Sequence, residues 1–127
     1  MREILFRGRT PKGEWIEGKG VDLCFGIPFI LTEKRDCATM KSRVDKTFVS
    51  PETVGQYTGF KDKIGKRVFE GDIIKCEELY DAGQYPKYVT IVLPVVYAGG
   101  AFRPLTRCEP GSIEVIGNIH DNPELLE

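Results

Sequence analysis

Apolar and polar residues alternate over short stretches of this chain, and most stretches end at glycine or proline. The segment 2–8 places Ile4 and Phe6 on one face, and after a corner that contains proline and glycine the segment 14–23 alternates again. Alternation with a period of two predicts β-strands, and a turn between two such runs predicts a hairpin. We therefore expect an N-terminal β-hairpin in which Trp15 packs in the interior, against Phe6 or the terminal strand.

The next two segments predict less regular structure. Residues 24–32 are apolar but contain Gly26 and Pro28, which favours an edge strand or an irregular buried segment. Residues 33–46 are mostly polar and charged, with a single methionine at Met40, which favours a loop up to about residue 48, either mobile or without order.

The stretch 50–53 (SPET) has the sequence of a helix start. Serine can accept hydrogen bonds from the first free amides, proline suits the first helical position, and an acid suits the positive end of the helix dipole. Gly55 and Gly59 follow closely. We expect one or two helical turns here, with Val54 and Tyr57 facing inward.

Residues 58–72 predict a second hairpin, with its turn in the sequence DKIG. A two-residue type I′ turn needs positive φ at both central positions, which a β-branched isoleucine disfavours. We therefore expect negative φ at Ile64 and positive φ at Gly65, in a type II turn or in a three-residue loop with a bulge.

The rest of the chain also reads as strands. The pattern predicts strands over 73–76, 87–98 and 113–116, followed by a short terminal helix that starts at Asn122 and Pro123. The chain has 14 glycines and 8 prolines, most of them at these corners. Many short strands separated by turns predict a mostly β fold, a small antiparallel sandwich or barrel. A length of 127 residues fits a single domain over 1–127.

Composition narrows the class of protein. Apolar residues make up 41% and charged residues 29%, a balance typical of folded globular proteins. The longest apolar run, 89–98, is too short to span a bilayer and contains Pro94. The N-terminus lacks the apolar core of a signal peptide, so we expect a cytoplasmic protein without a membrane segment.

Four cysteines lie at positions 24, 37, 76 and 108, with no C-x-x-C pair among them. Zinc sites usually contain such close pairs, and disulfide frameworks usually occur as dense cysteine in short secreted chains. We therefore expect four reduced thiols that behave as small hydrophobic residues.

Three blocks of the sequence carry a family resemblance: MREILFRG followed by GEWIEG, then VSPETVGQYTGFKDKIGKRVFEGDIIK, then IEVIGNIHDNPELLE. Together and in this order they resemble the YopX family of phage and prophage proteins. The resemblance implies a phage or prophage origin in a bacterial host and a small barrel similar to SH3-type barrels. It implies no biochemical activity. Ile64 departs from the family pattern, which commonly has asparagine before the turn glycine.

Residues with catalytic potential are few, so we expect no enzyme and no cofactor. His120 is the only histidine, which excludes a site built from several histidines. Glu70 and Asp72 flank Gly71, and this sequence favours a turn over a metal-binding loop. The glycines near positions 18–20 and 98–100 lack the spacing of phosphate-binding loops.

Charge is distributed unevenly, although the formal net charge is −1. The segment from Lys34 to Arg67 contains nine cations and four acids, a formal charge of +5. The segment from Glu109 to the end contains five acids and no lysine or arginine. We take six cations as the candidate binding face: Lys61, Lys63, Lys66, Arg67, Arg43 and Lys46. The pattern favours a non-enzymatic module that binds nucleic acid or an acidic partner protein. The alternative is a self-associating assembly protein, a homo-oligomer whose basic and acidic regions meet between subunits.

Overall fold

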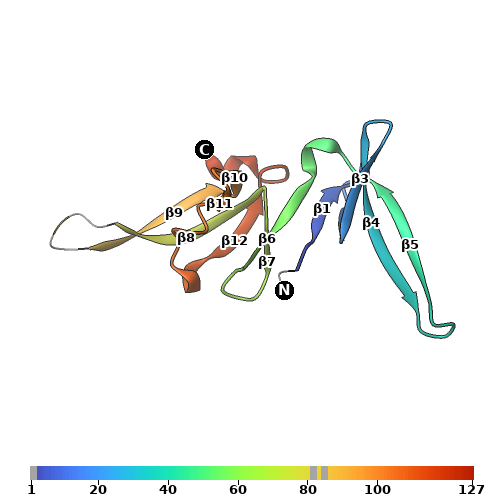
Figure 1. Ribbon diagram of the computed structural model, residues 1–127. Helices are drawn as coiled ribbons and strands as arrows, with labels where there is room; N and C mark the ends of the chain where they lie inside the picture. The colour runs from blue at the N-terminus through green and yellow to red at the C-terminus, as the bar shows by residue number, and fades with distance from the viewer. Residues whose placement is uncertain (1–2, 81–82, 84–85) are drawn as a thin grey trace. The chain divides into compact units, whose positions relative to one another are not determined.

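The structure is a computed structural model that describes residues 3–80, 83 and 86–127, and nearly all of its regular structure is antiparallel β-strand (Figure 1). The mostly β prediction is confirmed, and the helical segments of the described residues are 3₁₀ turns. The chain divides into two compact units, Met1–Tyr57 and Thr58–Glu127. The single domain over 1–127 stays a prediction. No sheet closes on itself in the described part, so the likeness to SH3-type barrels also stays a prediction.

The first unit contains two sets of paired strands. Its elements are β1 (Phe6–Arg9), β2 (Trp15–Gly18), β3 (Gly20–Cys24), β4 (Ile27–Asp36), β5 (Lys41–Phe48), the 3₁₀ turn η1 (Pro51–Thr53) and the first residues of β6 (Gly55–Lys61). Strand β1 pairs with β2 and with the start of β6, whereas β4 lies between β3 and β5. The expected N-terminal hairpin is therefore present as β1 and β2.

A small core holds these strands together. The buried apolar side chains of this unit are Leu5, Phe29, Ile30, Val49 and Tyr57. Strand β1 approaches Val49 so closely that a Cβ at Gly8 would lie 2.6 Å from the Cγ2 atom of Val49, which explains the glycine.

The turn η1 confirms a helical start after Ser50, but the Ser50 side chain makes no capping hydrogen bond. Its carbonyl oxygen instead accepts from the amide and hydroxyl of Thr53.

The prediction that Trp15 lies in the interior is wrong. Trp15 is half-buried, and its ring lies 4.7 Å from the guanidinium carbon of Arg7 and 5.8 Å from that of Arg9. Strand register is the reason, because Trp15 lies opposite Arg9 while Phe6 lies opposite Gly18. The indole therefore makes cation–π contacts across the hairpin, and these leave part of the ring in water.

The predictions for residues 24–48 are also corrected. These residues form a long hairpin in which β4 is the central strand of its sheet and all eight residues of β5 pair with it. The backbone ladder does not require apolar side chains, so a polar sequence can form it. At the base of the hairpin the rings of Phe29 and Phe48 pack edge to face, 5.7 Å apart.

The second unit is built on a three-stranded sheet. Its elements are the end of β6, β7 (Arg67–Phe69), β8 (Asp72–Tyr80), β9 (Lys87–Pro94), β10 (Val96–Ala98), β11 (Ala101–Arg103), β12 (Glu114–Asn118) and the 3₁₀ turns η2 (Pro110–Ser112) and η3 (Pro123–Leu126). The sheet order is β12-β8-β9, with β10 paired to β11 and β6 beside β7. The predicted strands near 73 and 113 and the terminal helical turn are confirmed, whereas the strand predicted over 87–98 is divided at Val95 into β9 and β10. Within the described residues no helix is long and apolar enough to cross a bilayer.

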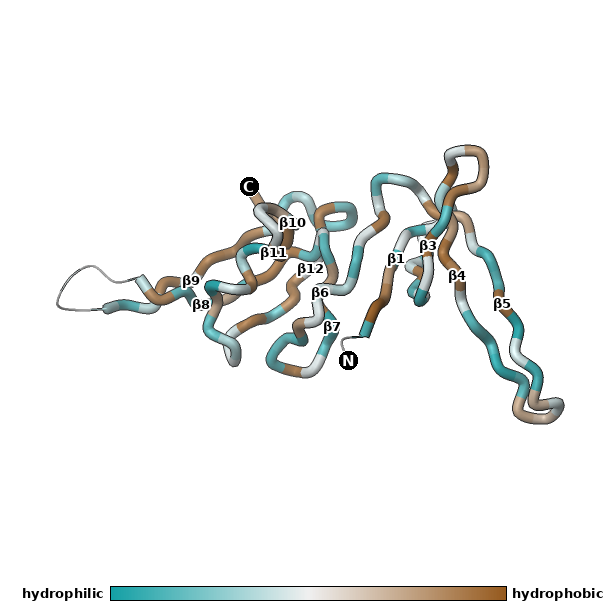
Figure 2. Tube along the Cα trace, viewed as in Figure 1, coloured by the Kyte–Doolittle hydropathy of each residue, from teal (hydrophilic) through white to brown (hydrophobic). Residues whose placement is uncertain are grey.

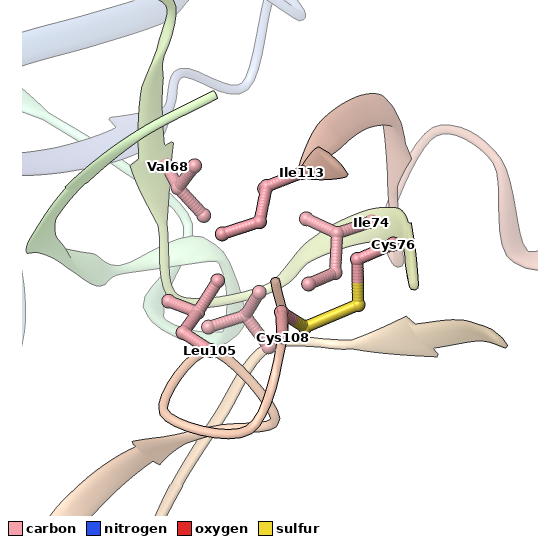
Figure 3. Packing of buried hydrophobic residues seen from close by; sticks show 7 residues of the cluster. Val68, Ile74, Cys76, Leu105, Cys108 and Ile113 are labelled. Atoms are coloured by element: carbon pink, nitrogen blue, oxygen red, sulfur yellow. A yellow bond between two sulfur atoms is a disulfide. The ribbon is translucent and has the colours of Figure 1, made fainter. Parts of the chain in front are cut away.

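Figure 3 shows the core of this unit, a cluster of buried residues. Its members are Val68, Ile74, Cys76, Val95, Leu105, Cys108 and Ile113. Cys76 and Cys108 are joined by a disulfide, which corrects the expectation of four reduced thiols. A separation of 32 residues gives no hint of this pairing, which depends on the loop after β11 folding back to bring Cys108 beside Glu78 of β8. Cys24 and Cys37 are free and exposed.

Candidate binding surfaces

The turn between β6 and β7 is a three-residue loop closed by its own backbone. The amide of Asp62 donates to the carbonyl of Lys66 at 2.8 Å, and the amide of Gly65 donates to the carbonyl of Asp62 at 3.0 Å. Gly65 has φ of +88°, whereas Ile64 is not among the residues with positive φ. The prediction for these two residues is confirmed, since only glycine takes the left-handed position.

The carboxylate of Asp62 organises this turn. Oδ1 accepts from the amides of Ile64 at 3.1 Å and Lys66 at 2.8 Å, and Oδ2 accepts from the amide of Val115 at 3.2 Å. Burial alone raises the pKa of Asp62, but the three amides and the charge of Lys66 outweigh burial and lower that pKa below its usual value. In the sequence, Asp62 enters only the count of acids, although its place just before a three-residue turn is the signal for this role.

Four cations of the predicted face surround this turn, and we call them the basic turn: Lys61, Lys63, Lys66 and Arg67. All four residues are exposed. Their charge is partly balanced, because Lys63 Nζ lies 3.1 Å from Glu114 Oε2 and Lys66 lies beside the Asp62 carboxylate. The basic turn is therefore a surface of moderate positive charge that Asp62 holds in shape.

The other two predicted residues, Arg43 and Lys46, lie on β5 in the first unit. Arg43 Nε lies 3.0 Å from Asp45 Oδ1. Lys46 Nζ lies 5.3 Å from the centre of the Phe29 ring, near the base of the hairpin. The six predicted residues thus divide between two compact units, four in the second and two in the first.

The outer part of the β4–β5 hairpin carries a denser group of cations, which we call the ribbon cations: Lys34, Arg35, Lys41 and Arg43. All are exposed, and together with Asp36, Thr39 and Ser42 they line a shallow hollow of about 450 Å³. Figure 2 shows the outer halves of both strands as a hydrophilic stretch. Three of these residues, Lys34, Arg35 and Lys41, are not in the predicted face, and the strand pairing places Lys34 opposite Arg43.

Two acids of the hairpin are occupied by local contacts. Asp36 Oδ1 accepts from the amide of Ala38 at 2.9 Å, and this bond together with one from the Thr39 side chain lowers the pKa of Asp36. Asp45 pairs with Arg43 and also with Lys34, whose Nζ lies 3.5 Å away. The acids therefore shape the hairpin and its turn, while most of the cation surface faces water.

The residues considered for catalysis have structural contacts. Asp72 is buried and accepts from the amide of Phe69 at 2.8 Å, and Gly71 has φ of +91°, so the sequence EGD forms a turn as expected. The backbone amide of His120 donates to Asn118 Oδ1 at 3.0 Å. Over residues 3–80, 83 and 86–127, no three histidine, cysteine or acidic side chains lie together as a metal site would require.

Comparison with known proteins gives a family and a structural relative. The crystal structure of protein EF1440 from Enterococcus faecalis is similar to this chain, with 26% sequence identity, a TM-score of 0.60 and coverage of 100% of both chains. No curated protein matches the chain. The family model described as YopX protein matches residues 6–127. Because this match covers nearly the whole sequence, the chain belongs to the YopX family.

Proposed function

We propose that the chain is a non-enzymatic binding module of a bacterial virus or prophage. It acts in the host cytoplasm and contacts a polyanion through the ribbon cations. Nucleic acid is the first candidate partner, and an acidic protein is the alternative. The resemblance described above supports the phage origin.

One observation carries this proposal: four exposed cations lie within the ten residues 34–43, where Asp36 is engaged in the turn, and the neighbouring Asp45 pairs with only two of them, Arg43 and Lys34. A two-stranded ribbon can enter a groove of duplex DNA, and lysine and arginine neutralise phosphates along it. The basic turn offers a second, weaker surface. Because the whole chain has a net charge of −1, we expect modest affinity that depends steeply on salt.

Fluorescence anisotropy with labelled duplex and single-stranded DNA tests the proposal. The logarithm of the association constant should fall linearly with the logarithm of the salt concentration between about 50 and 200 mM. The slope should be roughly −0.7 to −0.9 for each phosphate contact. Replacing the four ribbon cations by glutamine should reduce affinity at least about tenfold and flatten this slope.

Four exposed cations elsewhere serve as the matched control: Lys12, Lys19, Lys75 and Arg107. Their replacement by glutamine removes the same charge and should leave binding nearly unchanged. Equal losses in both variants would contradict a specific role for the ribbon. If neither form of DNA binds at about 50 mM salt, nucleic acid is excluded as the partner and an acidic peptide becomes the next probe.

Charge pairing between subunits, the alternative function, receives less support. The basic and acidic regions already meet within one chain, at the ion pair between Lys63 and Glu114.

A further inference from the structure

Strand β9 forms one edge of the sheet β12-β8-β9 and carries an uncharged stretch of six residues, Tyr88–Leu93. Figure 2 shows most of this strand as hydrophobic. Side chains on both faces are exposed, with 56% of Tyr88 and 44% of Val89 accessible to water, although Ile91 is partly buried against the core cluster. Soluble proteins usually protect such an edge by lysine, proline or a bulge, and none of these lies within the six residues.

The backbone of β9 also offers free hydrogen-bonding groups. The amide of Val95 donates to the carbonyl of Asp72, so the backbone of Val95 faces β8. Every second residue along β9 faces the same way as Val95, and the residues between them point their amides and carbonyls away from β8. These residues are Tyr88, Thr90 and Val92. In the described part of the chain, β8 is the one strand that pairs with β9, and the turn η3 contacts β9 without a backbone hydrogen bond to it.

We propose that this edge pairs in antiparallel fashion with the same edge of a second copy, so that two three-stranded sheets become continuous across a two-fold axis. Register follows from the backbone. If Thr90 lies opposite Thr90 of the second copy, Tyr88 lies opposite Val92, and every outward amide meets an outward carbonyl. A shift by two residues toward the end of the strand would place Tyr88 opposite Pro94, which has no amide hydrogen to donate.

The side chains suit this register and favour a second copy over an unrelated strand. Aromatic residues pair well with β-branched residues, as do threonines with each other. The nearest charge, Lys87, lies at the end of the strand, so the two lysines would be separated by roughly 20 Å at about 3.3 Å per residue. By contrast, the edge strand β5 carries a charge at Lys41, Arg43 and Asp45. The pairing is independent of the polyanion proposal, because it uses no cation of either basic surface.

Sedimentation equilibrium of the full chain with the Thr90→Pro variant tests this pairing. The wild type should approach twice 14.3 kDa at micromolar concentrations. Thr90→Pro removes an outward donor and no bond to β8, so the variant should stay at the mass of one chain with an unchanged far-UV CD spectrum. The control Thr90→Val keeps the amide and the β-branched shape and should dimerise. A wild type that remains one chain at about 100 µM would overturn the proposal, as would an undiminished dimer of the proline variant.

Hydrogen exchange of the wild type decides the matter if the proline variant does not fold. The amides of Tyr88, Thr90 and Val92 should become protected as concentration rises, while those of Val89 and Ile91, which face β8, should be protected throughout. Equal exchange of the first three amides at all concentrations would contradict the pairing.

Discussion

Two long hairpins, β4–β5 and β8–β9, have similar backbones but expose different side chains, charged in the first and apolar in the second. Both consist of strands of 8 to 10 residues paired over most of their length. The first exposes lysine and arginine at its outer end, whereas the second exposes valine, leucine and tyrosine. Since the same ladder forms with either surface, side-chain chemistry in these hairpins is not dictated by strand formation. The difference underlies the two contacts that we propose, one electrostatic and one made by strand pairing.

The largest expected effect is a difference in stability between substitutions at the base of the β8–β9 hairpin and substitutions in its outer part. Ile74 is fully buried, whereas 44% of Val89 is exposed. Ile74→Ala should lower the free energy of unfolding by about 2–5 kcal/mol because it leaves a cavity. Val89→Ala should change it by less than about 0.5 kcal/mol. Urea denaturation of both variants in the Thr90→Pro background, which stays at one chain, measures the two effects. A similar cost for the two would show that the outer apolar residues stabilise the fold itself.

The basic turn differs from the ribbon because a buried acid holds its shape. Asp62→Asn should cost about 1.5–3 kcal/mol at neutral pH, since charged acceptors make the stronger hydrogen bonds. The folded pKa of Asp62 is lowered from 3.8, so its stabilisation is full above the unfolded pKa and is lost as pH falls through the folded pKa. Melting curves from about pH 2 to pH 7 should show this acid loss in the wild type and less of it in Asp62→Asn. Parallel curves would contradict the role of Asp62.

A smaller effect is expected at the tip of the basic turn. Gly65→Val should destabilise the chain by more than about 1 kcal/mol, because valine rarely adopts positive φ. Space is not the reason, since nothing lies within 4 Å of a Cβ at Gly65. Ile64→Asn is the matched control at a residue that is 80% exposed, and it should be neutral or slightly stabilising. Thermal unfolding measures both, and a tolerated valine would count against the turn geometry.

The smallest effect on stability should come from the cations. Replacing the ribbon cations by glutamine, or reversing the charges of the basic turn, should shift the free energy of unfolding by roughly 0–1 kcal/mol for each ion pair. Binding of DNA or of an acidic peptide should nevertheless weaken, chiefly with the ribbon variant. Unchanged binding by both variants would contradict the assignment of a binding role to either surface.

Much of the fold could be predicted from the sequence because turns and alternation leave local marks. Gly65 and Gly71 take the positive φ values that their positions indicate, and both end strands of the chain fall near the expected residues. These features depend on a few neighbouring residues. The three sequence blocks that resemble the YopX family lie in the family's order, and the match of the family model to residues 6–127 confirms the resemblance.

The features that could not be predicted depend on contacts between distant residues. The polar segment after Glu33 forms β5 only through pairing with β4, and Trp15 meets arginines because of its register with β1. The disulfide needs a loop that brings Cys108 to β8. For the candidate site, Lys34 was counted among the nine cations but not placed in the six-residue face beside Arg43, and a sequence read as a loop gives no cross-strand neighbours.

The claim that the two hairpins make independent contacts is tested most directly by sedimentation velocity. The protein is mixed with a labelled DNA duplex at about 50 and about 500 mM sodium chloride. High salt should release the DNA, because phosphate contacts are screened, while the protein should stay at the mass of two chains, because strand pairing uses no charge. A protein that falls to one chain as the DNA leaves, or DNA that stays bound in high salt, would contradict the assignment of these two contacts to separate hairpins.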